Sequence, residues 1–118
     1  MMLLFEYIDV YRYNSSMDKI FKALADINRR RIITLLNGNE MSVNELLKNF
    51  DNIGQSTLSN HLSILRKAKL VDFKIFGKQR IYRLNKDLLV AFAENMRRFV
   101  GKIDESFVED IEIRESKV

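Results

Sequence analysis

The sequence of 118 residues contains no cysteine and no proline, and its one histidine is His61. Without cysteine the chain has no disulfide, no thiolate metal ligand and no cysteine nucleophile. A single histidine cannot build a histidine-rich metal cage within one chain. No acid, base or nucleophile accompanies it in the cluster that an active site requires. We therefore expect no enzymatic activity, no cofactor and no metal site.

Long apolar runs are also absent. The chain begins with five apolar residues, but Glu6, Asp9 and Arg12 soon interrupt the pattern. A secretory signal needs a basic start and a longer apolar core, and a membrane span needs about 20 apolar residues. These features predict a cytoplasmic protein that does not insert into a membrane.

The length and the apolar fraction of 47 % fit one domain over residues 1–118. The sequence has no repeats, no low-complexity tract and no linker rich in proline or glycine. We divide it into an N-terminal extension (1–16), a core (17–84) and a C-terminal dimerisation helix with its tail (85–118). Met17 is an alternative biological start, and residues 1–16 would then not belong to the native protein.

Positive charge is concentrated in one segment. Residues 55–83 hold seven cations and one anion, Asp72, so the net charge of this segment is +6. The net charge of the whole chain is +4, and the remaining residues therefore sum to −2. One basic segment in a near-neutral chain is typical of a docking face for a polyanion. A solvated positive surface without a partner is the alternative.

Capping residues delimit the first helices. Ile20, Phe21, Leu24 and Ala25 form an apolar stripe, and Asp26 is placed to cap the following helix. Asn37-Gly38-Asn39 ends that second helix, with Gly38 suited to a left-handed residue. Ser42-Val43-Asn44-Glu45 is a capping box that opens a short third helix.

The second half predicts a helix, a hairpin and a long final helix. The helix runs from Gln55 to Lys69, and two β-rich runs around Gly77-Lys78 form a hairpin over residues 70–84. Six apolar side chains are expected to hold this hairpin on the helices: Val71, Phe73, Ile75, Ile81, Tyr82 and Leu84. The order predicts a mainly α fold with a small β-hairpin wing, a winged helix-turn-helix.

The helix over residues 55–69 has two contrasting faces. On a wheel of about 100° per residue, one side collects small polar side chains and the other collects leucines. The polar side is Gln55, Ser56, Ser59, Asn60 and Ser63, and the apolar side is Leu58, Leu62 and Leu65. Short hydroxyl and amide side chains let a helix enter the major groove of DNA closely. This face therefore predicts direct readout of double-stranded DNA.

The candidate DNA-binding residues come from this helix and from the hairpin. They are Gln55, Ser56, Thr57, Ser59, Asn60 and His61 on the helix, and Lys74, Lys78, Gln79 and Arg80 on the hairpin. Positive charge on a projecting turn suits phosphate neutralisation or entry into the minor groove. His61 falls beside the leucines, so a histidine packed at the core edge is the favoured interpretation and a phosphate contact the alternative.

Three segments in this order and spacing resemble the ArsR/SmtB family of bacterial winged-helix repressors. They are residues 21–32, beginning Phe21-Lys22-Ala23-Leu24-Ala25-Asp26, residues 55–71, and residues 77–84. The resemblance covers about residues 17–105 and implies a homodimeric repressor that binds an operator inverted repeat. It places recognition contacts at Gln55, Ser56, Ser59 and Asn60 and wing contacts at Lys78, Gln79 and Arg80. Where the family often has proline after the aspartate, this chain has Ile27.

The resemblance does not extend to the metal sites of the family. Ser42 and Asn44 stand where many members carry cysteines, and hydroxyl and amide groups do not hold a soft metal ion. The final helix has no histidine, so we expect no metal effector. The cysteine-free pattern is similar to the SdpR-type branch, which implies a protein anti-repressor as the partner that relieves repression.

The final helix carries an apolar seam. Leu89, Phe92, Met96, Phe99, Ile103 and Phe107 recur every three or four residues over about five turns, roughly 27 Å of helix. The alternative to a dimer is burial against residues 17–36. Pairing with a second copy also supplies the two-fold symmetry that places two recognition helices about one DNA turn apart. The sequence thus predicts a homodimeric transcriptional repressor, with a winged-helix protein-interaction module that does not bind specific DNA as the alternative.

Overall fold

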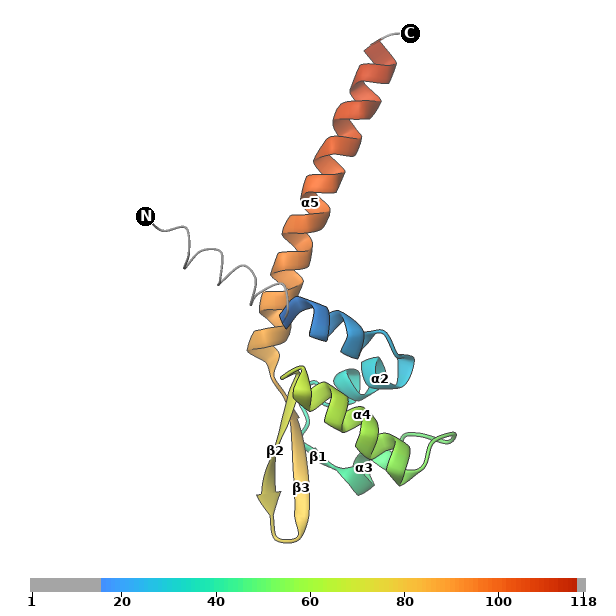
Figure 1. Ribbon diagram of the computed structural model, residues 1–118, viewed down its shortest axis with the longest axis vertical. Helices are drawn as coiled ribbons and strands as arrows, with labels where there is room; N and C mark the ends of the chain where they lie inside the picture. The colour runs from blue at the N-terminus through green and yellow to red at the C-terminus, as the bar shows by residue number, and fades with distance from the viewer. Residues whose placement is uncertain (1–15, 117–118) are drawn as a thin grey trace, which may run out of the picture. The chain divides into compact units, whose positions relative to one another are not determined.

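The computed structural model describes residues 16–116, and the side chains of residues 16–103. A helical segment at residues 16–24 comes first. It is followed by α2 (Ile27–Leu35), β1 (Met41–Ser42), α3 (Val43–Leu47), α4 (Gln55–Lys67), β2 (Val71–Phe76), β3 (Gln79–Leu84) and α5 (Lys86–Ser116), as Figure 1 shows. The extension assigned to residues 1–16 lies outside the described residues except for Ser16.

The chain divides after Lys86 into two compact units. The first unit contains the helices up to α4 and the sheet, and the second is α5 from Asp87 onward. Among the helices of residues 16–116, none has a stretch both long and apolar enough to cross a bilayer.

Side-chain caps fix the starts of α2 and α3, as the sequence predicts. The Asp26 carboxylate accepts hydrogen bonds from the backbone N–H groups of Asn28 (2.8 Å) and Arg29 (3.2 Å). Ser42 and Glu45 form the reciprocal capping box at α3. Gly38 takes a left-handed conformation with φ of 82° after α2. These contacts satisfy N–H groups that a helix cannot pair internally.

The core of the first unit is built from one face of each helix and from the base of the hairpin. Ile20 and Ala23 are buried in the first helical segment, whereas Phe21 is 45 % exposed and Ala25 is exposed. The predicted stripe is therefore wrong for Phe21 and Ala25. The side chains that face the core are Ile20 and Ala23, which lie three residues apart on the same side of the helix. The largest fully buried side chains are Ile32, Leu36, Leu46, Leu58, Leu62, Leu65, Leu70 and Val71.

Helix α4 ends two residues before the predicted position. Ala68 is its C-cap, and Lys69 follows in the left-handed region with φ of 63°. Lys69 N–H donates to the Arg66 carbonyl (2.9 Å) and Leu70 N–H to the Leu65 carbonyl (3.0 Å). This pair of bonds is the Schellman motif, whose left-handed position normally favours glycine.

The sheet has three antiparallel strands in the order β1-β3-β2. The β2–β3 hairpin was predicted, and it turns through Gly77 (φ 62°) and Lys78, as a two-residue type II′ turn requires. Strand β1 was not predicted; Met41 lies opposite Tyr82 on β3. Val71 and Tyr82 are buried, but Ile75 is 72 % exposed. Its predicted packing role was wrong, because the hairpin continues beyond the side chains that cover its base.

Candidate nucleic-acid interface

Helix α4 presents the two faces that its sequence predicts. Leu58, Leu62 and Leu65 have no exposed surface, and they fix this helix on the core. The opposite face exposes five of the candidate DNA-binding side chains and half-buries Ser63. The exposed five are Gln55, Ser56, Thr57, Ser59 and Asn60.

The exposed face of α4 forms one wall of a groove of about 420 Å³. Its other walls are the start of α3 and the hairpin. The structure thereby brings together predicted residues that lie far apart in sequence: Gln55 and Ser59 with Lys78, Gln79 and Arg80. The five other predicted residues do not line it: Ser56, Thr57, Asn60, His61 and Lys74.

Besides Ser42, which caps α3, and Tyr82, three polar residues of the groove were not among the predicted site residues. Ser63 and Arg66 continue the α4 wall, and Asn44 comes from the start of α3. The helical wheel contains the signal for Arg66, because it falls at about 20°, between Gln55 and Ser59. Nothing local in the sequence indicates Asn44, since its place depends on how α3 packs against the hairpin.

The cations of this region fall into two groups. Lys74 Nζ lies 2.7 Å from Glu40, and Arg83 Nε lies 2.6 Å from Asp72. The hydrogen bond from Arg83 to Asp72 raises the pKa of Arg83 above its ordinary value. By contrast Arg66, Lys78 and Arg80, which line the groove, have no ion pair with any residue of the described part of the chain.

Both arginines of the groove contact the ring of Phe73. The guanidinium of Arg66 lies 5.1 Å from the centre of the Phe73 ring, and that of Arg80 lies 4.7 Å from it. A cation over an aromatic face is stabilised without losing its charge. Phe73 therefore positions two positive charges at the boundary between α4 and the hairpin.

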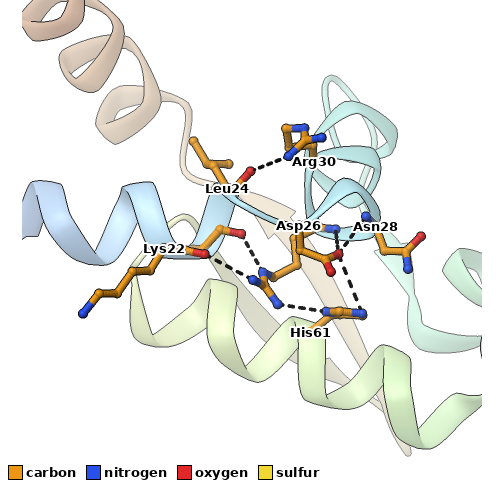
Figure 2. A network of polar contacts seen from close by, with 8 residues as sticks. Lys22, Leu24, Asp26, Asn28, Arg30 and His61 are labelled. Atoms are coloured by element: carbon orange, nitrogen blue, oxygen red, sulfur yellow. Dashed lines mark hydrogen bonds and ion pairs between the residues drawn. The ribbon is translucent and has the colours of Figure 1, made fainter.

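His61 faces the start of α2 and is 8 % exposed. Figure 2 shows the ring of His61 beside Asp26, with its Nε2 atom 3.9 Å from the carboxylate. Arg29 Nη1 lies 3.2 Å from the Nδ1 atom of the ring. Because a guanidinium only donates, Nδ1 is the acceptor and the neutral ring carries its proton on Nε2, toward Asp26. This geometry matches the favoured interpretation of a histidine at the core edge.

Arg29 connects the same network to the preceding helical segment. Its Nε donates to the Ala23 carbonyl (2.6 Å) and its Nη2 to the Lys22 carbonyl (3.1 Å). The end of one helix, the cap of α2 and the middle of α4 are thus joined through a single guanidinium. The network links α4 to the two helical segments that precede it.

The predicted seam on α5 combines half-buried and exposed apolar side chains. Leu89, Phe92 and Met96 are half-buried, whereas Phe99 and Ile103 are 61 % and 54 % exposed. Phe107, the last residue of the predicted seam, has a side chain outside the described set. Val100, which was not predicted, is a further exposed apolar residue at 53 %.

No group of three histidine, cysteine, aspartate or glutamate side chains that could hold a metal ion occurs among the described residues. The Ser42 hydroxyl accepts the Glu45 N–H (3.2 Å) as part of the α3 cap. Asn44 is the second residue that stands at a cysteine position of the metal-sensing pattern, and it lines the groove.

Comparison with known proteins identifies the family. The family described as "Bacterial regulatory protein, arsR family" matches residues 26–72. The transcriptional repressor SdpR of Bacillus subtilis is 34 % identical over 88 residues, which cover 75 % of this chain and 97 % of SdpR. The transcriptional activator HlyU of Vibrio cholerae is 34 % identical over 79 residues, or 67 % of this chain and 72 % of HlyU.

Solved structures show the same fold. An ArsR-like transcriptional regulator from Rhodococcus sp. RHA1 superposes with a TM-score of 0.76 at 24 % identity, covering 90 % of this chain and 96 % of that one. A homodimeric winged helix-turn-helix DNA-binding domain from Mycobacterium bovis gives a TM-score of 0.63 at 23 % identity, over 80 % and 88 % of the two chains. The predicted winged helix-turn-helix is thus confirmed, and the chain belongs to the ArsR family of bacterial regulatory proteins.

Proposed function

We propose that the protein is a homodimeric transcriptional repressor that binds an operator inverted repeat. The observation that carries this proposal is the groove that combines the short polar side chains of α4 with three cations, Arg66, Lys78 and Arg80. Short polar side chains read base edges, whereas cations hold the phosphate backbone. One relative, SdpR, is named as a repressor and another, HlyU, as an activator. We propose repression because SdpR is matched over a larger share of both chains.

The α4 face supplies the base contacts. Gln55, Ser56, Thr57, Ser59 and Asn60 are exposed on the side away from the buried leucines. An amide side chain pairs bidentately with adenine, and hydroxyls bond to several bases. His61 does not belong to this contact set, because it faces Asp26 and Arg29; its role is to position α4.

The hairpin supplies the backbone contacts. Lys78, Gln79 and Arg80 lie at or beside the turn and also line the groove. A DNA strand that passes between α4 and the hairpin meets their charges together with that of Arg66. Lys74 contributes after release from Glu40, which holds it at 2.7 Å.

Helix α5 supplies the dimer contact. Phe99 and Ile103 expose more than half of their surface, as does Val100 beside them. Exposed apolar residues that follow a helical seam are stabilised by burial against an equivalent helix. A dimer that neutralises about eight phosphates gives a slope near −7 in log affinity against log salt.

The same proposal places the protein in the cytoplasm, where the bacterial chromosome is. It requires no cofactor and no metal effector, since the chain offers neither cysteine nor a second histidine. A protein anti-repressor is the class of inducer that we propose, because the cysteine-free pattern is similar to the SdpR-type branch, and SdpR itself is 34 % identical to this chain.

The test uses a 30-bp duplex that the wild-type protein selects from a random-sequence library, here named the selected duplex. Ser59→Glu or Asn60→Glu places a carboxylate against phosphates and base acceptors, so we expect binding to be abolished in an anisotropy titration. Thr34→Glu is the matched control, since it adds the same charge at an exposed position on α2. Wild-type affinity in the α4 variants would remove this helix from recognition.

A further inference from the structure

The outer half of the hairpin carries two large apolar side chains in solvent. Residues 74–80 are all exposed, and Ile75 and Phe76 are 72 % and 75 % exposed. Figure 1 shows the turn between β2 and β3 as a free end of the first unit. These two side chains lie immediately before that turn, so they form the end of the hairpin together with Gly77 and Lys78.

Folding of the first unit does not account for these two residues. The hairpin is held at its base, where Val71 and Tyr82 are 1 % and 6 % exposed. The ring of Phe73 packs on the ring of Tyr82 with 5.4 Å between centroids. A polar side chain at position 75 or 76 would not lower the free energy of unfolding through the core, because neither side chain is part of the core.

The surroundings of the two side chains are cationic. Lys78 lies in the turn, and Arg80 lies opposite Ile75 across the hairpin. The only acidic residue in the hairpin sequence, Asp72, lies near its base and is held by Arg83 at 2.6 Å. The end of the hairpin is therefore apolar and positive at once, which favours a polyanion that also offers apolar surface.

We propose that Ile75 and Phe76 form an apolar wedge that enters the DNA minor groove and partly unstacks a base step. This inference rests on the proposed DNA-binding function and adds a deformation of the DNA to it. Apolar side chains inserted from the minor groove kink a duplex by about 20–90° toward the major groove. Such a bend discriminates among sequences by their flexibility, without hydrogen bonds to bases.

Two features favour the minor groove as the partner of the wedge. Gln79 and Arg80 belong both to the hairpin end and to the groove beside α4, so the wedge is continuous with the proposed DNA surface. Ile75 and Phe76 also point to opposite faces of the hairpin, because neighbouring strand residues alternate. A hairpin end that is apolar on both faces meets the sugars on both walls of the minor groove.

The experiment measures the bend of the selected duplex by energy transfer between dyes at its two ends. We expect wild-type protein to shorten the end-to-end distance, and Phe76→Ala to remove at least half of that change and to weaken binding about tenfold. Phe76→Leu keeps an apolar wedge and should retain most of both effects. The salt slope should not change in either variant, since no charge is removed.

Ile27→Ala is the matched control, because Ile27 is 71 % exposed but lies at the start of α2. It should bind and bend as wild type does. If Phe76→Ala also binds and bends as wild type does, the wedge is overturned while the DNA-binding function stands. Loss of binding to anionic lipid vesicles in Phe76→Ala with unchanged DNA bending would assign the patch to a membrane surface instead. Failure of the wild-type protein to select any duplex would overturn the wedge and the function together.

Discussion

Replacing Asp26 by alanine tests whether the α2 cap holds the first unit together. The carboxylate accepts two backbone hydrogen bonds, from Asn28 (2.8 Å) and Arg29 (3.2 Å), and it lies 3.9 Å from His61 Nε2. Removing an aspartate N-cap costs about 1 kcal/mol, within a range of about 0.5–2. The contact with His61 is long and the Asp26 side chain is 35 % exposed, so it adds little.

We therefore expect Asp26→Ala to lower the free energy of unfolding by about 1 kcal/mol per protomer at pH 7. For a domain of this size the midpoint falls by about 4 °C. The assay is urea or thermal unfolding at one fixed protein concentration, because dimer dissociation makes the midpoint concentration-dependent. Asp26→Asn is the matched control, since asparagine caps a helix about as well as aspartate.

The pH dependence supplies an independent check on the same carboxylate. Burial raises the pKa of Asp26, but the N–H groups of Arg29 and Asn28, the nearby His61 ring and the positive charge of Arg29 lower it more, so it lies below its ordinary value. Stability from this group is therefore fully present above the unfolded value and is lost as the pH falls through the folded value. The gap between wild type and Asp26→Ala should narrow below about pH 4, and part of it should remain because the protonated carboxyl keeps a carbonyl oxygen that accepts a hydrogen bond.

Two results would refute this reasoning about the cap. One is wild-type stability in Asp26→Ala at neutral pH. The other is a loss in Asp26→Asn as large as that in the alanine variant, since it would assign the effect to the charge rather than to the cap.

Substitutions at Ile27, Lys69 and Phe99 test the helix ends and the dimer contact. Ile27→Pro should stabilise the first unit by about 0.5 kcal/mol in urea unfolding, because proline suits the first position of a helix. The preceding residue, Asp26, already has the extended backbone that proline requires (φ −108°, ψ 135°). A destabilised variant would contradict this. Lys69→Gly should gain about 0.5 kcal/mol by relieving the left-handed strain (φ 63°), whereas Lys69→Ala should gain nothing. Phe99→Glu should give monomers in sedimentation and at least tenfold weaker DNA binding, and a variant that stays dimeric would remove Phe99 from the interface.

Local chemistry made much of the fold predictable. The caps at Asp26 and Ser42 and the left-handed Gly38 depend on residues a few positions apart, and all three were found from the sequence. The buried leucines of α4 followed from helical periodicity alone. The family resemblance was confirmed in the same way, because it rests on short segments in a fixed order.

Long-range packing accounts for what the sequence did not reveal. Strand β1 has only two residues, Met41 and Ser42, and it forms by pairing with β3. Two residues are too few to show the alternating pattern that predicts a strand. The partners of His61 are 32 and 35 positions away, at Arg29 and Asp26. The exposure of Ile75 depends on how far the helices reach along the hairpin, which composition does not encode.

Sequencing the duplexes that the wild-type protein selects from a random library tests directly whether two α4 helices read an operator. We expect an inverted repeat whose half-site centres lie about 10 bp or a multiple of it apart, because two α4 helices related by two-fold symmetry read one face of the DNA. The Asn60→Glu protein should enrich no such repeat. A pool without enrichment, or one that the Asn60→Glu protein reproduces, would contradict the reading of DNA by α4.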